Sequence, residues 1–152
     1  MVSCGDVNRI AVNLLLVLLL GTATPAFAGE ELVLIVSAGS AIDELDSTEV
    51  RKLFLGLTVQ RSGRRLHPLL NESDAELKEI FLQNIVSMSD STYDRYVLQL
   101  SLQRGHAQPL VYKGNAQLIS GVAADSAAVS YAWRKDVEHD SRIRILRVVW
   151  HD

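Results

Sequence analysis

The side chains that most often carry chemistry are few and scattered in this chain. Its four histidines, His67, His106, His139 and His151, show neither H-x-x-x-H nor H-x-H spacing, so we interpret them as surface residues and expect no metal site. The single cysteine, Cys4, lies close to the N-terminus. The sequence contains no G-x-S-x-G elbow, no G-x-x-x-x-G-K-S/T loop and no G-x-G-x-x-G fingerprint. Because no pair of nucleophile and base is visible either, we expect no cofactor and no enzymatic activity.

Two charged clusters have a structural interpretation. Four acids stand where a helix is expected to begin: Asp43, Glu44, Asp46 and Glu49. Acids at this position interact favourably with the positive end of the helix dipole, which explains them without a catalytic role. Three arginines surround the expected turn at Ser62-Gly63: Arg61, Arg64 and Arg65. We interpret them as a solvated hairpin tip, with the docking of an acidic partner as the alternative.

The N-terminal segment has the three parts of a secretory signal peptide. Arg9 supplies positive charge, residues 10–20 form the apolar region, and Ala26-Phe27-Ala28 offers small residues at the cleavage site. The alternative is an uncleaved anchor, but Gly21, Thr22 and Pro25 dilute the apolar stretch. We therefore predict a signal peptide over residues 1–28, cleavage near Ala28 and a periplasmic or secreted protein.

The remaining residues, 29–152, form a single expected domain. They contain no cysteine, so stability must come from one hydrophobic core without disulfides. The formal net charge of the whole chain is −3, and removing Asp6 and Arg9 with the signal leaves it unchanged. Such a charge provides no general attraction to nucleic acid, so nucleic acid is not an expected partner.

The hydrophobic pattern of the domain alternates between strands and helices. Strands are expected over residues 31–36, 66–70, 127–133 and 143–150, and helices over 46–55, 74–86, 89–104 and 115–122. The continuous apolar run 31–36 is typical of a strand buried on both faces, as in parallel sheets, whereas Pro68 favours an edge or irregular position. The alternation predicts a layered α/β domain.

Sequence signals also mark the ends of several helices. Asp46 with Glu49, and Ser73 with Glu76, have the spacing of capping boxes. Gly56 is expected to end the first helix and Gly105 the third.

Three segments follow one another in a characteristic order. They are Leu45 to Gly56, with L-D-S-T-E-V-R-K-L-F-L-G, Asn71 to Phe81, with N-E-S-D-A-E-L-K-E-I-F, and Val122 to Tyr131. In this order they resemble the periplasmic phosphate-binding proteins of ABC transporters, above all their short single-lobe relatives. The resemblance extends over nearly all of residues 31–149. It implies a three-layer α/β/α sandwich like one lobe of a type II periplasmic binding protein, in which helix N-termini and hydroxyl groups hold an anion.

The signature loop of that family, R-E-S-G-S-G-T-R-x-x-F, is altered in this chain. When the two are aligned on Phe81, the arginine falls on Asn71, the first serine is kept as Ser73, and the first glycine falls on Asp74. The following serine, glycine and threonine are replaced by Ala75, Glu76 and Leu77. The resemblance therefore implies weak or altered oxyanion binding.

Two functional hypotheses follow from this resemblance. The first is a solute-binding accessory to transport or sensing that holds phosphate or another small oxyanion weakly. Its ligand-binding residues would be Ser37, Gly39, Ser40, Asn71 and Ser73. The second is a periplasmic interaction module that has lost its ligand and docks to a membrane transporter, receptor or sensor.

Overall fold

The computed structural model describes residues 29–104 and 108–152. The predicted signal peptide, residues 1–28, and the predicted helix stop at Gly105 lie outside the described residues. The helices and strands are β1 (Glu31–Ser37), α2 (Ser47–Phe54), β2 (Gln60–Arg61), β3 (Arg64–Arg65), β4 (His67–Asn71), α3 (Ala75–Phe81), the π-helical turn η1 (Leu82–Val86), α4 (Asp90–Arg104), β5 (Leu110–Tyr112), α5 (Asn115–Ala124), β6 (Ala128–Trp133), α6 (Arg134–Val137) and β7 (Ile143–His151). Within the described ranges, no helix combines the length and apolar character needed to cross a membrane.

A five-stranded mixed sheet with the order β5-β4-β6-β1-β7 forms the centre of the domain. Strand β4 runs parallel to β5 and β6, whereas β1 runs antiparallel to β6 and β7. The predicted burial of β1 on both faces is confirmed, because residues 32–37 are all buried. Its expected parallel pairing is wrong. The strand is buried because helices cover both faces of the sheet, and this covering is independent of strand direction.

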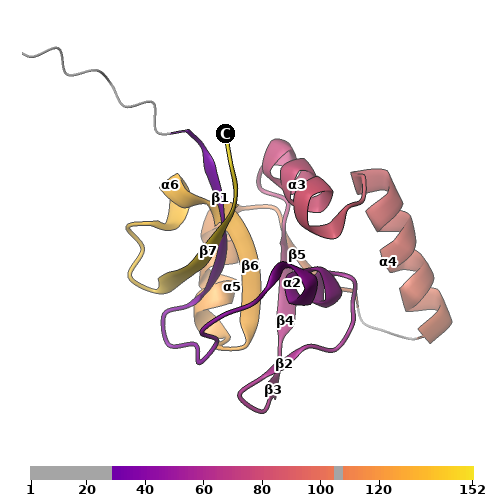
Figure 1. Cartoon of the computed structure of the whole chain (residues 1–152), viewed down its shortest axis with the longest axis horizontal. Coiled ribbons are helices and arrows are strands. Elements are labelled where there is room, and N and C mark those ends of the chain that lie inside the picture. The colour runs from indigo at the N-terminus through magenta and orange to yellow at the C-terminus, as the bar shows by residue number, and fades with distance from the viewer. Residues whose placement is uncertain (1–28, 105–107) are drawn as a thin grey trace, which may run out of the picture.

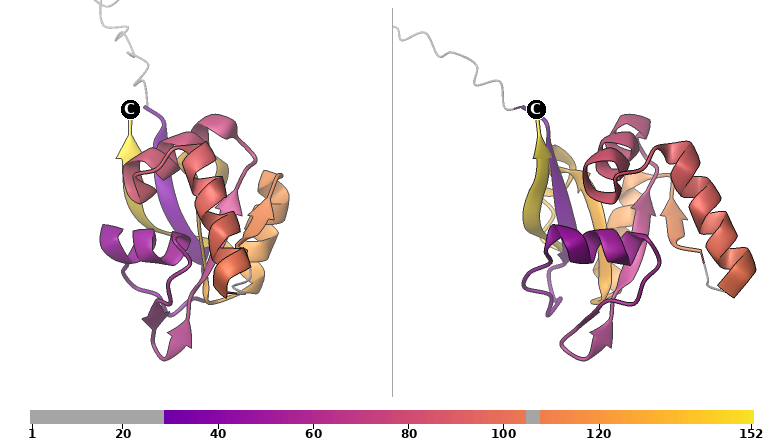
Figure 2. Two further views of the ribbon diagram at one scale, coloured as in Figure 1. Left: turned by 90° about the vertical axis from the view of Figure 1, so that its right-hand side faces the viewer. Right: turned by 45° about the vertical axis from the view of Figure 1, so that its right-hand side comes forward.

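Helices cover the two faces of this sheet (Figure 1). Alternate residues of β1 point to different sides: Leu32 and Leu34 belong to the core under α2, α3 and η1, while Val33 and Ile35 belong to the core under α5 and α6. Helix α4 lies on the outer side of the first layer, beside the end of the sheet formed by β4 and β5 (Figure 2). This arrangement confirms the predicted three-layer α/β/α sandwich.

The first helix follows its sequence signals. The Asp46 side chain accepts a hydrogen bond from the Glu49 backbone N–H at 2.8 Å, and Glu49 accepts one from the Asp46 backbone at 3.1 Å, which confirms the predicted capping box. Gly56 has φ of +76° directly after the C-cap residue, a left-handed conformation that glycine adopts without strain. The predicted end of this helix is therefore confirmed.

The second helix differs from the prediction at its N-terminus. Its N-cap is Asp74, whose carboxylate accepts hydrogen bonds from the backbone N–H groups of Glu76 at 2.8 Å and Leu77 at 3.1 Å. The predicted capping box of Ser73 and Glu76 is wrong. Ser73 instead donates its hydroxyl proton to the Asn71 side chain at 2.6 Å. Serine and aspartate can both cap a helix. The helix begins one residue later than expected, so Asp74 and not Ser73 is the N-cap.

Two alternatives were expected for Pro68, an edge strand or an irregular position, and the edge is wrong because β4 lies between β5 and β6. Only His67 and Pro68 pair with β6, while residues 69–71 pair with β5. The proline therefore lies where the β4 and β6 ladder ends.

The other expected helices and strands agree with the structure to within one or two residues. Strands β6 and β7, helices α4 and α5, and the turn at Ser62-Gly63 are present, and both turn residues have positive φ. Strand β5 and helix α6 were not expected. They contain three and four residues respectively, too few for a periodic pattern.

Candidate functional site

The residues that align with the family's anion loop lie at the C-terminal end of β4. Asn71 is buried there with 1% exposure, and its amide nitrogen donates to the Tyr131 carbonyl at 2.9 Å. Its side-chain oxygen accepts from the backbone N–H of Ser73 at 3.0 Å and from the Ser73 hydroxyl at 2.6 Å. The polar groups of Asn71 and Ser73 therefore already have partners within the protein.

A carboxylate occupies the start of the following helix. Asp74 accepts the two N–H groups described above, and its second oxygen accepts from the Trp133 indole at 3.2 Å. The hydrogen bonds from Leu77 and then from Trp133 lower the pKa of Asp74 by more than burial raises it. Asp74 is therefore negatively charged at neutral pH, and it uses the N–H groups that an anion at this helix end would need.

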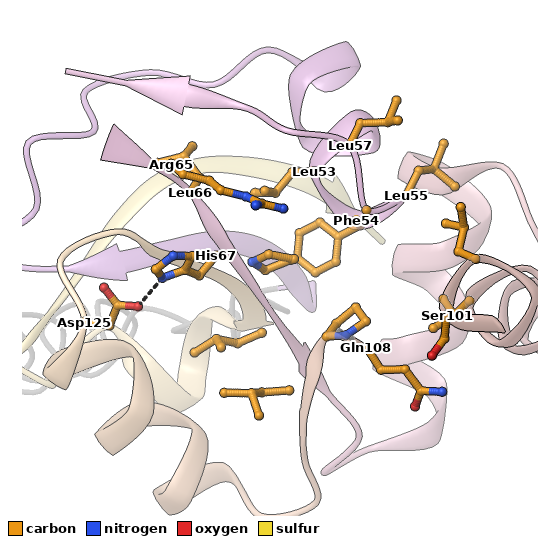
Figure 3. A pocket seen from close by; sticks show the side chains of 17 residues that line it. Leu53, Phe54, Leu55, Leu57, Arg65, Leu66, His67, Ser101, Gln108 and Asp125 are labelled. Atoms are coloured by element: carbon orange, nitrogen blue, oxygen red, sulfur yellow. Dashed lines mark hydrogen bonds and ion pairs between the residues drawn. The ribbon is translucent and has the colours of Figure 1, made fainter. Parts of the chain in front are cut away.

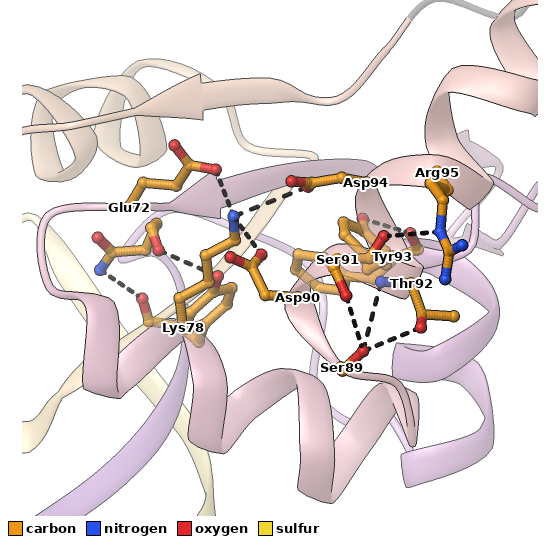
Figure 4. A network of polar contacts seen from close by, with 12 residues as sticks. Glu72, Lys78, Ser89, Asp90, Ser91, Thr92, Tyr93, Asp94 and Arg95 are labelled. Atoms are coloured by element: carbon orange, nitrogen blue, oxygen red, sulfur yellow. Dashed lines mark hydrogen bonds and ion pairs between the residues drawn. The ribbon is translucent and has the colours of Figure 1, made fainter.

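Beside this loop, a buried lysine forms ion pairs with three carboxylates (Figure 4). The Lys78 ammonium lies 2.7 Å from both Glu72 and Asp90 and 3.9 Å from Asp94. Burial lowers the pKa of Lys78, but the hydrogen bonds to Asp90 and Glu72 outweigh it and the pKa is raised. Lys78 therefore stays charged and is neutralised locally, so it provides no free positive charge for a phosphate.

Sequence reasoning missed this lysine because its neighbours are not adjacent in the chain. In the sequence Lys78 stands between Leu77 and Glu79 and looks like an ordinary surface residue of a helix. The one local signal is the spacing of Asp90 and Asp94, which are four residues apart and therefore share a helix face.

The other predicted ligand residues lie at the opposite end of the sheet. Ser37 ends β1, where the preceding Val36 pairs with Val129 near the start of β6, whereas Asn71 contacts Tyr131 farther along the same strand. The Ser40 hydroxyl donates to the Ser126 carbonyl at 2.6 Å and accepts from the Ile42 N–H at 3.3 Å.

The hydroxyl of Ser37 also has an internal partner, the Ala123 carbonyl at 3.4 Å. Gly39 is exposed, and a Cβ there would meet no atom within 4 Å. The structure thus brings Asn71 and Ser73 together and Ser37, Gly39 and Ser40 together, but it does not bring the two groups into one site.

A cavity lies elsewhere, between the end of α2, the start of β4, α4 and β5 (Figure 3). Its volume is about 640 Å³ and most of its lining is apolar. At one side, the His67 ring contacts the Asp125 carboxylate at 2.7 Å. Sequence reasoning did not anticipate this cavity, because its lining comes from segments far apart in the chain.

Neither a metal centre nor a catalytic triad is evident in the described parts of the chain. No group of three or more His, Cys, Asp or Glu residues is arranged there to hold a metal ion. The described contacts of the His67 ring include Asp125 and no hydroxyl group. The pair can fix the orientation of the imidazole, but among the described residues it has no nucleophile to activate.

In layer order and sheet topology, the fold is like one α/β lobe of periplasmic binding proteins. Solved structures with this fold include an ABC-type phosphate transport receptor from Vibrio cholerae, with 14% sequence identity and a TM-score of 0.50 over 79% of this chain and 46% of that one. PstS from Borrelia burgdorferi has 15% identity and a TM-score of 0.55 over 78% and 47% of the two chains. A protein described as a possible phosphate binding protein from Planctomyces limnophilus has 11% identity and a TM-score of 0.55 over 79% and 42%.

These comparisons confirm the resemblance in fold to phosphate ABC transporter substrate-binding proteins. The chain spans less than half the length of each of these structures, as expected for a single lobe. No protein-family model and no curated protein matches the sequence.

Proposed function

We propose that this protein is an exported, non-enzymatic solute-binding-like lobe, accessory to transport or sensing, in which oxyanion binding is weak. The single observation that carries this proposal is the Asp74 carboxylate on the N–H groups of Glu76 and Leu77. The fold supports the class of solute-binding proteins, because similar structures include a phosphate transport receptor. The altered loop supports weak binding.

The charges around the loop argue against tight phosphate capture. Glu72, Asp74 and Asp90 lie at this end of the domain, and the nearby Lys78 is already paired. A phosphate dianion would have to displace a carboxylate that is hydrogen-bonded three times and would then face the remaining negative charges. The repulsion between these carboxylates and the phosphate disfavours binding. The loop contains no arginine whose positive charge could compensate for this repulsion.

Calorimetry with inorganic phosphate at neutral pH tests this proposal. We expect a dissociation constant of about 1 mM or weaker, which corresponds to roughly −4 kcal/mol. A matched measurement with Asp74→Asn keeps a side-chain acceptor at the N-cap and removes its charge. A micromolar dissociation constant for the unmodified protein would contradict weak binding, because it would show that phosphate displaces the Asp74 cap.

The second candidate function is an interaction module that docks to a membrane transporter, receptor or sensor. The observation that favours it is a group of exposed large apolar side chains on α4 and β5: Leu98, Leu102, Leu110 and Val111. Photocrosslinking in the native cell from position 102, with position 79 on α3 as the control, distinguishes the two functions. A membrane protein crosslinked from position 102 alone would support the interaction module, whereas equal crosslinking from both positions would contradict it.

A further inference from the structure

Most of the residues that line the cavity described above are apolar. Phe54 and Leu66 are almost fully buried and form part of its wall, and Val97 and Leu100 close it from α4. Its volume of about 640 Å³ lies within the range of small-molecule sites, about 300 to 1,000 Å³. An apolar hollow of this size is large enough for a hydrocarbon chain, and it is partly open to solvent.

The rim is shaped by the chain reversal that follows α2. Gly56, with its left-handed φ of +76°, turns the backbone so that Leu57 lies on the cavity rim with 44% exposure. Leu110 of the edge strand β5 also lines the cavity and is 64% exposed. These two leucines leave apolar surface in water, which an apolar ligand would cover.

Among the described residues, the charged groups that line this cavity lie at one side of it (Figure 3). Arg65, His67 and Asp125 come from β3, the start of β4 and the loop before β6, and the other polar lining residues, Ser101 and Gln108, are neutral. Burial raises the pKa of Asp125, but the hydrogen bonds from His67 and from the Ala127 N–H lower it by more, so this carboxylate is charged and engaged.

Among the described residues at this side, Arg65 is the cation that is available to a ligand. The described contacts give its guanidinium no carboxylate partner, in contrast to Arg61, which pairs with Glu49. Figure 3 shows the Arg65 side chain extending over the cavity toward Phe54. A guanidinium beside an apolar hollow favours a ligand that carries an anionic head, because charge-assisted hydrogen bonds are stronger than neutral ones.

We propose that this cavity binds a single-chain anionic amphiphile, with its hydrocarbon chain between α2 and α4 and its carboxylate or equivalent head on Arg65. The site is separate from the loop at Asn71 and Asp74, since it opens beside the start of β4 and not its end. The proposal therefore does not depend on whether phosphate binds at that loop.

Calorimetric titration with dodecanoate, below its micelle concentration, tests the proposal on protein purified from cells that express the full chain. We expect a dissociation constant of about 10 to 100 µM and at least about tenfold weaker binding of dodecyltrimethylammonium, which has the same chain and the opposite charge. Arg65→Gln should weaken dodecanoate binding about tenfold. The matched control Arg64→Gln removes an arginine of the same hairpin that does not line the cavity, and it should leave affinity within about twofold.

A second pair of variants tests the apolar part of the site. Leu57→Asn on the rim should weaken binding about fivefold, whereas Leu102→Asn, on an exposed leucine of α4 that does not line the cavity, should have no effect. Flotation with phosphatidylglycerol vesicles separates a free amphiphile from a membrane lipid, and we expect the protein to stay unbound. The absence of binding by dodecanoate up to about 1 mM, equal affinity for both headgroup charges, equal loss in both arginine variants, or flotation with vesicles would each overturn the proposal.

Discussion

Asn71 and Tyr131 hold β4 and β6 together by a reciprocal pair of hydrogen bonds beyond the end of the ladder between these strands. The Asn71 amide donates to the Tyr131 carbonyl at 2.9 Å, and the Tyr131 hydroxyl donates to the Asn71 carbonyl at 3.1 Å. Ser130 adds a third bridge, because its hydroxyl donates to the Leu69 carbonyl at 2.8 Å. Burial raises the pKa of Tyr131, so its hydroxyl stays protonated and available as a donor. Side chains thus replace backbone pairing where the two strands separate.

Tyr131→Phe should destabilise the protein by about 1 to 3 kcal/mol, because a buried carbonyl loses its donor. The ring stacks on Phe81 with centroids 3.7 Å apart, and phenylalanine preserves this contact. Urea denaturation measures the change. The control is Tyr96→Phe, whose hydroxyl bonds the Leu55 carbonyl at 3.1 Å in a half-buried position where water can replace it. Equal effects of the two substitutions would contradict the role of the Asn71 and Tyr131 pair.

Asp74→Asn should lower stability at pH 7, and the difference from the unmodified protein should shrink in acid. The pKa of Asp74 is depressed in the folded protein, so its stabilising contribution is present above the unfolded value of about 3.9 and is lost as the pH falls through the folded pKa. Urea denaturation of both proteins at pH 7 and at several acid pH values checks this. A difference that stays constant down to complete protonation would show that the carboxylate charge does not stabilise the helix.

Removing two of the three carboxylates of the loop should strengthen phosphate binding. Asp74→Ser with Glu76→Gln keeps a capping side chain and removes two negative charges, and we expect affinity to rise by about fivefold to tenfold. We leave Asn71 unchanged because it is buried and hydrogen-bonded on both sides, so an arginine there would disrupt the core. Calorimetry measures the effect. The control with equal net charge is Asp43→Ser with Glu44→Gln, two exposed acids before α2, and an equal gain in that protein would exclude a local effect.

Gly121→Ala should be destabilising, although alanine usually stabilises a helix interior by about 1 kcal/mol relative to glycine. A Cβ at Gly121 in α5 would lie 2.5 Å from the Tyr112 hydroxyl oxygen and 2.7 Å from the adjoining ring carbon. The Tyr112 ring must then move, at a cost of about 1 to 3 kcal/mol. In a Tyr112→Ala background the same change should become stabilising, and thermal denaturation of the four proteins gives the coupling. A destabilisation that persists without Tyr112 would show that another contact is responsible.

The protein recovered from its native cells should begin at Gly29, because Ala26 and Ala28 provide the small residues that a signal peptidase requires. Intact mass spectrometry of the exported fraction measures this. Replacing Ala28 with a bulky residue, as in Ala28→Tyr, should prevent cleavage there, whereas Phe27→Leu should not. A mass that retains residues 1–28 in the unmodified protein would support an uncleaved anchor instead.

The features that the sequence determined by itself are those that depend on neighbours in the chain. The capping box of Asp46 and Glu49, the helix end at Gly56 and the turn at Ser62-Gly63 follow from local hydrogen bonds and backbone preferences. The alternation of expected strands and helices was enough to indicate an α/β sandwich, because the spacing of apolar residues differs between a strand and a helix and can be recognised within each segment. The family resemblance added the class of lobe, and the similar structures agree with it in fold.

Only the tertiary structure decided which distant segments meet. The antiparallel direction of β1 and the inner position of β4 depend on pairing partners from other parts of the chain, which no local pattern specifies. For the same reason, Ser40 and Asn71 lie at opposite ends of the sheet although both were predicted to bind one ligand. The cavity beside Arg65 likewise requires α2, β4, α4 and β5 together. Residues from all of these elements line the cavity, so its apolar and charged groups come together only when the elements pack against one another.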